Sequence, residues 1–204
     1  MAVPYKAPVK DIVFGYEVID SYNVLNKISA FSDFSEDIVI PTMEECAKFS
    51  EEVLAPINAI GDQQGATIKD GVVTMPEEFV DAYKKFAEAG WASISLPSDI
   101  GGGGMPITLS GGTLEILSTA NLAFGLAPGL SAGAISAINF HGNQEQKDKF
   151  LPKLVSGEWT GTMNLSEPQS GSDLGTITTK AEPQEDGSYT VSYTHLTLPT
   201  RCLG

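Results

Sequence analysis

The feature that most constrains the fold is a change in the spacing of apolar residues near position 158. Up to about Gly157, apolar side chains recur every three or four residues, which is the spacing of one face of an α-helix. After Trp159 the chain changes to short β-branched stretches at 160–166, 176–181 and 188–192, separated by turn residues. We therefore predict a mainly α-helical N-terminal domain followed by the first strands of a β-domain.

The first sixty residues predict one short helix and one long helix. Weak periodicity over 1–34 predicts an extended arm that leads into a short helix near 21–30. A clear amphipathic pattern then predicts a helix from residue 35 to about residue 60. Pro41 falls early enough to be tolerated, whereas Pro56 is expected to kink or end this helix.

Local end signals predict the later helices. Thr74 and Glu77 have the spacing of a capping box at the start of a helix, and Gly90 is expected to cap its end. Two further helices are predicted within 107–140. Asn143, with a glutamine three residues later, reads as the N-cap of the last helix.

Charge and cysteine usage exclude several classes of function. The chain has 26 acidic and 12 basic residues and a net charge of −14, with no basic stripe, which argues against nucleic acid or an anionic membrane surface as a partner. Cys46 and Cys202 lie far apart with no histidine beside either, so neither a disulfide framework nor a zinc site is indicated. The N-terminus lacks an export signal, and a cytoplasmic location is expected.

An uncharged stretch at 116–144 raises the question of a membrane helix. It exceeds the roughly 20 residues that span a bilayer. Pro128, several glycines and several serines interrupt it, so we expect no membrane span. A pair of fully buried, small-residue-rich helices at the centre of a bundle is the preferred interpretation.

Three features could carry chemistry but have simpler explanations. The run Gly101–Gly104 could cradle a phosphate, yet no βαβ pattern surrounds it, so a structural loop is favoured. His141 has no partner suited to catalysis or metal binding, and it reads as a structural or helix-terminal residue. Glu167 could act as a general base, but a lone carboxylate in a turn is usually solvated or capping.

The segment Leu165–Asp173 is the most informative motif. It combines hydroxyl side chains, a proline turn and a glycine, and it lies where helices give way to strands. Such a loop is a plausible site for holding a polar ring or a phosphate. From the residues alone the prediction stops there.

This segment resembles the signature of the acyl-CoA dehydrogenase family, except that Asn164 replaces the usual small first residue. Two further blocks, 142–157 and 96–104, resemble the helix before that signature and the family's proline-glycine loop. The resemblance covers roughly 35–191 and is greatest to the branch that contains methylmercaptopropionyl-CoA dehydrogenases. It implies an N-terminal arm at 1–34, the family's helical domain at 35–157, the start of its middle β-domain at 158–192 and a non-matching, extraneous tail at 193–204.

The resemblance implies a flavoenzyme of fatty acid metabolism that binds FAD and an acyl-CoA. A carboxylate base removes the α-proton of the acyl group while the β-hydrogen passes as hydride to the flavin. By motif position, Met163 and Leu165 would contact the flavin through their backbone, and the hydroxyl of Ser166 would hydrogen-bond near its N5 atom. Gly171 and Ser172 would contact the CoA portion.

No catalytic residue is assigned within these 204 residues, because the family supplies its base from a C-terminal helical domain. The chain is therefore expected to be an inactive N-terminal fragment. The resemblance also implies an electron-transfer flavoprotein as electron acceptor and a homo-oligomer at full length. The alternative is a non-catalytic helical acyl-binding or scaffold protein.

Overall fold

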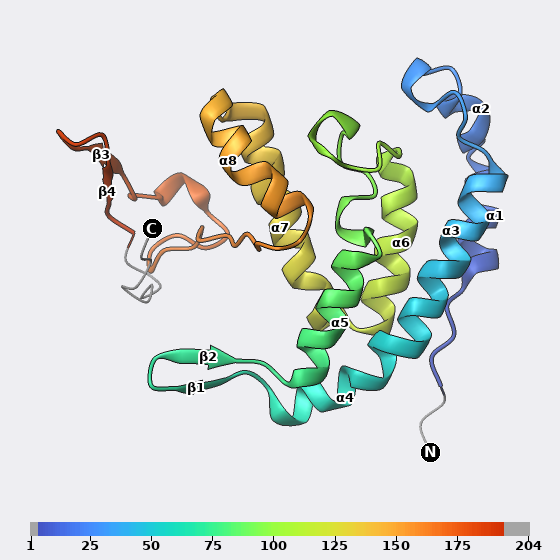
Figure 1. Cartoon of the computed structure of the whole chain (residues 1–204), viewed down its shortest axis with the longest axis horizontal. Helices are drawn as coiled ribbons and strands as arrows, with labels where there is room; N and C mark the ends of the chain where they lie inside the picture. The colour runs from blue at the N-terminus through green and yellow to red at the C-terminus, as the bar shows by residue number, and fades with distance from the viewer. Residues whose placement is uncertain (1–3, 194–204) are drawn as a thin grey trace. The chain divides into compact units, whose positions relative to one another are not determined.

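The computed structural model describes residues 4–193 and divides into two units, Met1–Thr162 and Met163–Gly204. Helices α1 to α8 belong to the first unit, and a short hairpin, β3 and β4, belongs to the second (Figure 1). The predicted order, a mainly helical domain followed by strands, is confirmed. The division lies slightly beyond the predicted boundary at 157/158.

A helix begins at Val9, so the predicted extended arm is wrong beyond residue 8, whereas the predicted short helix near 21–30 is confirmed. The N-terminal region contains α1 (Val9–Val18), α2 (Ser21–Leu25) and a 3₁₀ turn at Ser29–Phe31. Only Val13 and Tyr16 of α1 are buried, which explains its weak periodicity. Tertiary contact stabilises α1 instead, because it packs on α3 and its Tyr16 hydroxyl donates to the Thr108 carbonyl at 2.7 Å.

The predicted long helix is confirmed and continues to Gln64, past Pro56, with a π-helical interruption just before that proline. It consists of α3 (Glu36–Phe49), a π-helical segment (Ser50–Leu54) and α4 (Ala55–Gln64). Pro56 lies in the first turn of α4, directly after the π segment, and both a proline and a π segment are places where a helix bends. The chain then enters the hairpin of β1 (Thr67–Lys69) and β2 (Val72–Thr74).

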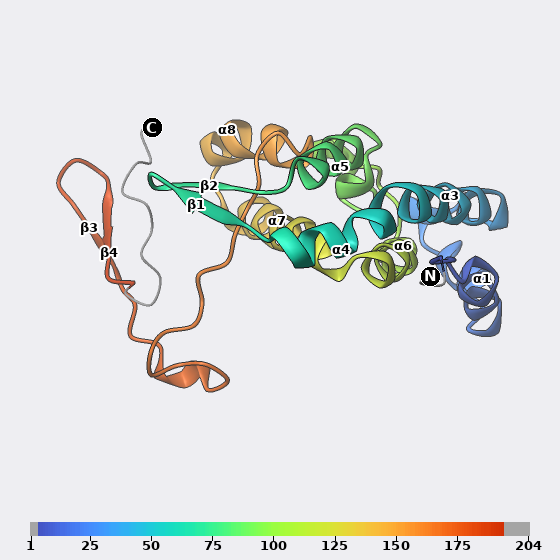
Figure 2. The same cartoon turned by 90° about the horizontal axis from the view of Figure 1, so that it is seen from below.

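This hairpin, absent from the sequence-based prediction, replaces the capping box expected at Thr74. Thr74 pairs with Thr67 in the antiparallel ladder, and α5 (Glu77–Glu88) begins after Pro76 with no side-chain cap. Asp70 and Gly71 form the turn with φ values of 52° and 78°, the left-handed conformation that an Asp-Gly hairpin turn requires. The hairpin extends away from the helices (Figure 2). At the other end of α5, Gly90 adopts a φ of 76° and its N–H donates to Ala87, so its predicted capping role is confirmed.

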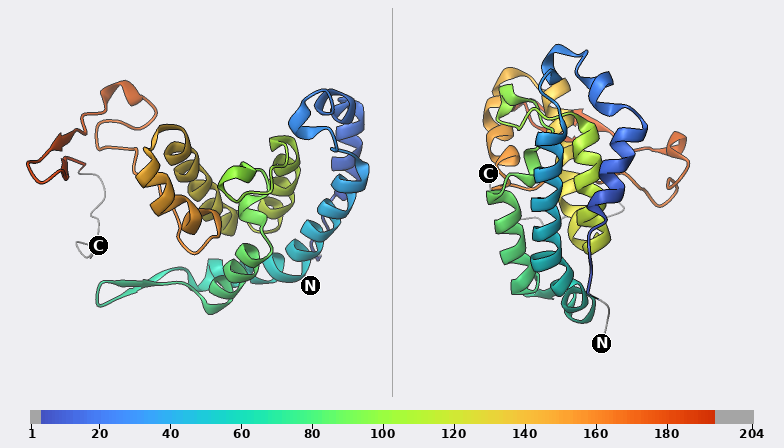
Figure 3. Two further views of the ribbon diagram at one scale, coloured as in Figure 1. Left: turned by 45° about the horizontal axis from the view of Figure 1, so that its top comes forward. Right: turned by 90° about the vertical axis from the view of Figure 1, so that its right-hand side faces the viewer.

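The remaining helices are α6 (Ile107–Ala120), α7 (Leu122–His141) and α8 (Gln144–Val155). Asn121 separates the first two, and its side chain accepts from the Phe124 N–H. The predicted N-cap at Asn143 is confirmed as a complete capping box with Gln146. Helices α1, α3 and α6 lie side by side, as do α7 and α8 (Figures 1 and 3).

The main core lies where α3 meets α6. Val39, Met43 and Cys46 of α3 are fully buried, as are Leu109 and Ile116 of α6. The two helices approach closely because α6 has Gly112 at the contact, where a Cβ atom would lie 2.5 Å from the Met43 side chain. A smaller cluster joins α7 and α8 through Ile135, Leu151, Leu154 and Val155.

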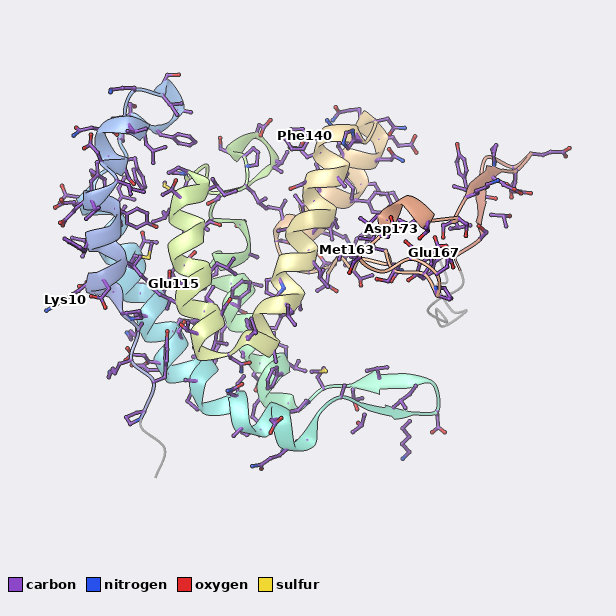
Figure 4. The ribbon with its side chains drawn as sticks, turned by 180° about the vertical axis from the view of Figure 1, so that it is seen from behind. Lys10, Glu115, Phe140, Met163, Glu167 and Asp173 are labelled. Atoms are coloured by element: carbon purple, nitrogen blue, oxygen red, sulfur yellow. The ribbon has the colours of Figure 1, made fainter. Side chains whose placement is uncertain are left out.

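Helix α7 is not fully buried, which corrects the predicted pair of buried helices. Leu122 and Leu126 are each 62% exposed, and Phe140 near its C-terminal end is 78% exposed (Figure 4). By length and composition alone, α7 could cross a bilayer, and no other helix of residues 4–193 meets that test. Core helices of water-soluble proteins meet it equally well, so the finding is weak evidence for a membrane span.

The second unit contains less regular structure than predicted. Only β3 (Ala181–Pro183) and β4 (Tyr189–Val191) form a ladder, while 160–166 is irregular and the 176–181 stretch contributes only Ala181. Of its residues up to Tyr193, only Glu167 and Ser170 are buried, and both are polar. This part of the chain is therefore organised by hydrogen bonds rather than by an apolar core.

Candidate functional site

The candidate site is the segment from Met163 to Thr179, which begins the second unit (Figure 4). Pro168 and Gln169 form a tight turn between Glu167 and Ser170, whose backbones exchange two hydrogen bonds of 2.8 and 3.0 Å. Asp173 then caps a 3₁₀ turn at Leu174–Thr176 by accepting from the Gly175 N–H at 2.9 Å. The motif is thus a closed loop that supplies its own backbone partners.

Glu167 lies at the centre of this loop and is only 6% exposed. Its Oε1 atom accepts from the Thr179 N–H at 2.9 Å, and its Oε2 atom accepts from the Thr178 N–H at 3.1 Å and hydroxyl at 2.9 Å. The Gln169 amide also donates to Oε2, at 2.6 Å. Hydrogen bonds from Thr179 and Thr178 lower the pKa of Glu167 to about 2. An acceptor so weakly basic and so fully engaged is unsuited to act as a general base.

Two hydroxyl side chains complete the loop. The Ser170 hydroxyl, almost fully buried, donates to the Asp173 carbonyl at 2.9 Å. Thr176 donates to the carbonyls of Gln169 and Asp173, each at 3.0 Å. Sequence reasoning did not find the roles of Thr176, Thr178 and Thr179, because nothing local in the sequence links them to residues seven to twelve positions earlier.

The residues predicted to face the flavin lie just before this loop. Unlike Glu167 and Ser170, they are exposed and make few hydrogen bonds within the part of the chain that the structure describes. Met163 is 60% exposed, Leu165 is 39% exposed and Ser166 is also exposed. The backbone N–H groups of 163–166 make no hydrogen bond to any residue of the described part, 4–193. The Ser166 carbonyl accepts from the Tyr193 hydroxyl at 2.7 Å. This run therefore presents a row of donors without internal partners.

Gly171 and Ser172, predicted to contact CoA, are exposed on the same loop. A Cβ atom added at Gly171 would meet no atom within 4 Å, so the structure leaves open space there. All five predicted site residues are thus exposed within one continuous segment, 163–172. Of the predicted extraneous tail, Tyr193 alone is described, and 194–204, including His195 and Cys202, lie outside the described residues.

The other candidates from the sequence have structural roles or none. The N–H groups of Gly102, Gly103 and Gly104 donate to the carbonyls of Pro97, Ser93 and Leu96 at 2.8–3.0 Å, so they are not free to bind a phosphate. His141 is exposed at the last position of α7, as a helix-terminal residue. Within 4–193 no group of three potential metal ligands exists.

A cavity that sequence reasoning did not predict lies in the helical unit. It has a volume of about 630 Å³ and is bounded by α5, the start of α7 and the segment after α8. Phe79, Tyr83 and Phe124 form its aromatic wall. None of the predicted site residues lines it.

Comparisons with known proteins identify the family. The model of the acyl-CoA dehydrogenase N-terminal domain matches residues 41–158, more than half of the chain. The chain belongs to the acyl-CoA dehydrogenase family. The resemblance inferred from the signature loop is thereby confirmed.

Individual relatives agree with this assignment. The 3-methylmercaptopropionyl-CoA dehydrogenase of Ruegeria pomeroyi is 40% identical over 192 residues, which is 94% of this chain and 33% of that protein. A butyryl-CoA dehydrogenase of Syntrophomonas wolfei is 32% identical over 89% of this chain and 30% of its own length. The structure of an acyl-CoA dehydrogenase complexed with FAD from Bacillus anthracis is 27% identical with a TM-score of 0.64, covering 79% of this chain and 26% of that one. The chain thus spans about a third of the length of the curated relatives it matches.

Proposed function

We propose that this chain is the N-terminal part of an FAD-dependent acyl-CoA dehydrogenase that oxidises an acyl-CoA to the 2,3-enoyl-CoA. The family assignment supports the reaction class. The observation that carries the proposal is the signature segment, in which an exposed run of donors at 163–166 is joined to a loop that satisfies its own hydrogen bonds. Such a run is suited to hold a planar polar ring.

The residues present fit FAD as the cofactor. When bound, FAD supplies the acceptor for the hydride that leaves the β-carbon of the substrate. The backbones of Met163 and Leu165 and the hydroxyl of Ser166 would hold the flavin ring, and Gly171 and Ser172 would hold the CoA portion. N–H and O–H donors would suit a ring that gains negative charge on reduction, because such dipoles stabilise negative charge.

The base that removes the α-proton is proposed to lie outside these 204 residues. Glu167, the buried carboxylate of the signature loop, is engaged by Thr178, Thr179 and Gln169 and has a low pKa. The relatives are about three times as long as this chain, which leaves room for a base elsewhere. We accordingly propose that the chain alone does not turn over acyl-CoA. An electron-transfer flavoprotein as acceptor and a homo-oligomeric full-length enzyme complete the proposal.

The test compares the complete protein that contains this sequence with the 204-residue chain. Each is incubated anaerobically with FAD and then with butyryl-CoA or 3-methylmercaptopropionyl-CoA, and loss of the oxidised flavin absorbance is recorded. We expect the complete protein to bleach its flavin with at least one substrate and the chain alone with neither. Bleaching by the chain alone would overturn the location of the base. A complete protein that binds acyl-CoA without reducing FAD would instead favour the non-catalytic acyl-binding protein.

A further inference from the structure

The candidate site, residues 163–179, consists of two parts that differ in their hydrogen bonding. Residues 163–166 are exposed, and their N–H groups have no partner within 4–193. From 167 to 179 the chain is folded on itself by side-chain and backbone hydrogen bonds. Apart from the bond from the Tyr193 hydroxyl to the Ser166 carbonyl, the run 163–166 has no hydrogen bond in the described part of the chain, so it needs an anchor to keep one conformation, because ordering each residue costs conformational entropy.

Glu167 is the residue at which the two parts meet. It follows Ser166 directly, and its carboxylate bonds to the backbone of Thr178 and Thr179, eleven and twelve residues later. Its own N–H and carbonyl pair with Ser170. Both the backbone and the side chain of this residue are therefore fixed, and the fixed backbone is continuous with the exposed run.

We propose that Glu167 is a positioning residue for the flavin-facing run, setting where the backbone and hydroxyl of Ser166 lie without itself contacting the cofactor. This inference rests on the proposed function, since it assigns Glu167 a part in holding the same cofactor. It also explains why the motif has a carboxylate beside Ser166 that is not the catalytic base.

The chemistry of the four bonds requires an ionised carboxylate. All four groups that reach Glu167 are donors: two backbone N–H groups, one hydroxyl and one side-chain amide. A carboxylate has two acceptor oxygens and no hydrogen to oppose these donors, whereas a glutamine would direct its NH₂ group either at the Thr179 N–H or at the three donors that reach Oε2. The low pKa of Glu167 keeps the acceptor form at neutral pH.

The test substitutes Glu167→Gln in the full 204-residue chain, with Glu185→Gln as the matched control. Glu185 is exposed in the same unit, and its side chain makes no hydrogen bond to any residue in 4–193. Amide hydrogen exchange is measured by NMR without FAD. We expect E167Q to raise the exchange of Thr178 and Thr179 about ten-fold and to shift the Ser166 amide resonance, and E185Q to do neither. Unchanged exchange and resonances in E167Q would overturn the inference.

Repeating the exchange measurement over a range of pH separates an ionised carboxylate from a side chain that only fills space, because only the former gives a pH-dependent protection. The pKa of Glu167 is about 2 in the folded chain, against an ordinary value of 4.5. The stability that the ionised carboxylate gives to the loop is therefore complete above about pH 4.5 and is lost as the pH falls toward 2. The difference in protection between the wild-type chain and E167Q should therefore disappear over that interval. A difference that persists at pH 2 would contradict the role of the ionised carboxylate.

The final measurement is FAD affinity, followed by flavin fluorescence. We expect E167Q to weaken FAD binding about ten-fold and E185Q to leave it unchanged. If E167Q disturbs the loop but binds FAD as tightly as the wild-type chain, the positioning role is wrong. If the wild-type chain itself takes up no FAD, FAD binding by this chain is contradicted, while exchange and pH dependence still decide whether Glu167 organises the run.

Discussion

At the scale of single residues, Asn121 shows how one side chain can satisfy two backbone groups in different elements. Its Oδ1 atom accepts from the Phe124 N–H at 3.1 Å and caps α7, and its Nδ2 group donates to the Leu54 carbonyl at 3.2 Å. Leu54 ends the π-helical segment. Asn121 is almost fully buried, so water cannot replace either bond.

Replacing Asn121 by alanine should therefore cost more than losing an ordinary cap. We expect N121A to lower the free energy of unfolding by about 2–3 kcal/mol, because it removes two buried hydrogen bonds and leaves the Phe124 N–H in the first turn of α7 without its capping acceptor. N143A, at the exposed cap of α8, should cost about 1 kcal/mol. N121S retains a capping oxygen and should fall between them. Urea unfolding followed by circular dichroism measures all three, and an N121A cost no larger than that of N143A would refute the double role.

At the scale of elements, the loop Pro97–Pro106 folds back closely on the preceding backbone at Gly102 and Gly103. A Cβ atom at Gly102 would lie 2.2 Å from the Leu96 carbonyl oxygen, and one at Gly103 would lie 2.6 Å from that of Ile94. Their N–H groups donate to Pro97 and Ser93. Glycine is required here for close approach of two backbone segments, not for binding an anion.

An alanine substitution in this loop should therefore lower the stability of the chain, whereas one in α6 should raise it. We expect G102A to destabilise the chain by about 1–3 kcal/mol, because the new methyl group collides with main-chain atoms that cannot rotate away. G111A, in the exposed middle of α6 with no atom within 4 Å of its Cβ, should stabilise by about 0.5–1 kcal/mol. Thermal unfolding of both variants is the measurement. Equal effects would show that the loop accommodates a side chain.

At the scale of the whole molecule, the two units are stabilised by different interactions. The helical unit has an extensive apolar core, whereas the described residues of the second unit bury no apolar side chain. Burial of apolar surface is the main source of folding free energy. The helical unit should therefore fold by itself.

Shortening the chain after Thr162 should leave the helical unit's Tm within about 3 °C of that of the full chain. Shortening it after Val155 should lower the Tm further, because that change removes Trp159 and the bond from the Gly161 N–H to the Ser131 hydroxyl. The Trp159 ring packs on Phe150 and on the Lys153 ammonium group. Thermal unfolding followed by circular dichroism at the helix band gives the Tm of both shortened chains. A large loss after Thr162 would show that the second unit stabilises the first.

Features that depend on neighbours in the chain were predictable. The change from helix to strand, the capping box at Asn143 and the turn at Gly90 each depend on residues a few positions apart. The signature segment was recognisable for the same reason, because its residues are neighbours in the chain. The hairpin at 67–74, absent from the prediction, also has a local signal in the sequence, the Asp-Gly dipeptide at its turn.

Features that depend on partners far apart in the chain were not predictable from the sequence. Helix α1 is stabilised by contact with α3 and by a bond to residue 108, and Thr74 enters a β-ladder rather than capping a helix. The sequence by itself determined the order of elements and the position of the signature motif, because both follow from local spacing. Only the tertiary structure decided which helix faces are buried and which groups the Glu167 carboxylate binds. Burial and hydrogen bonding at those positions are set by groups that the chain brings together only on folding.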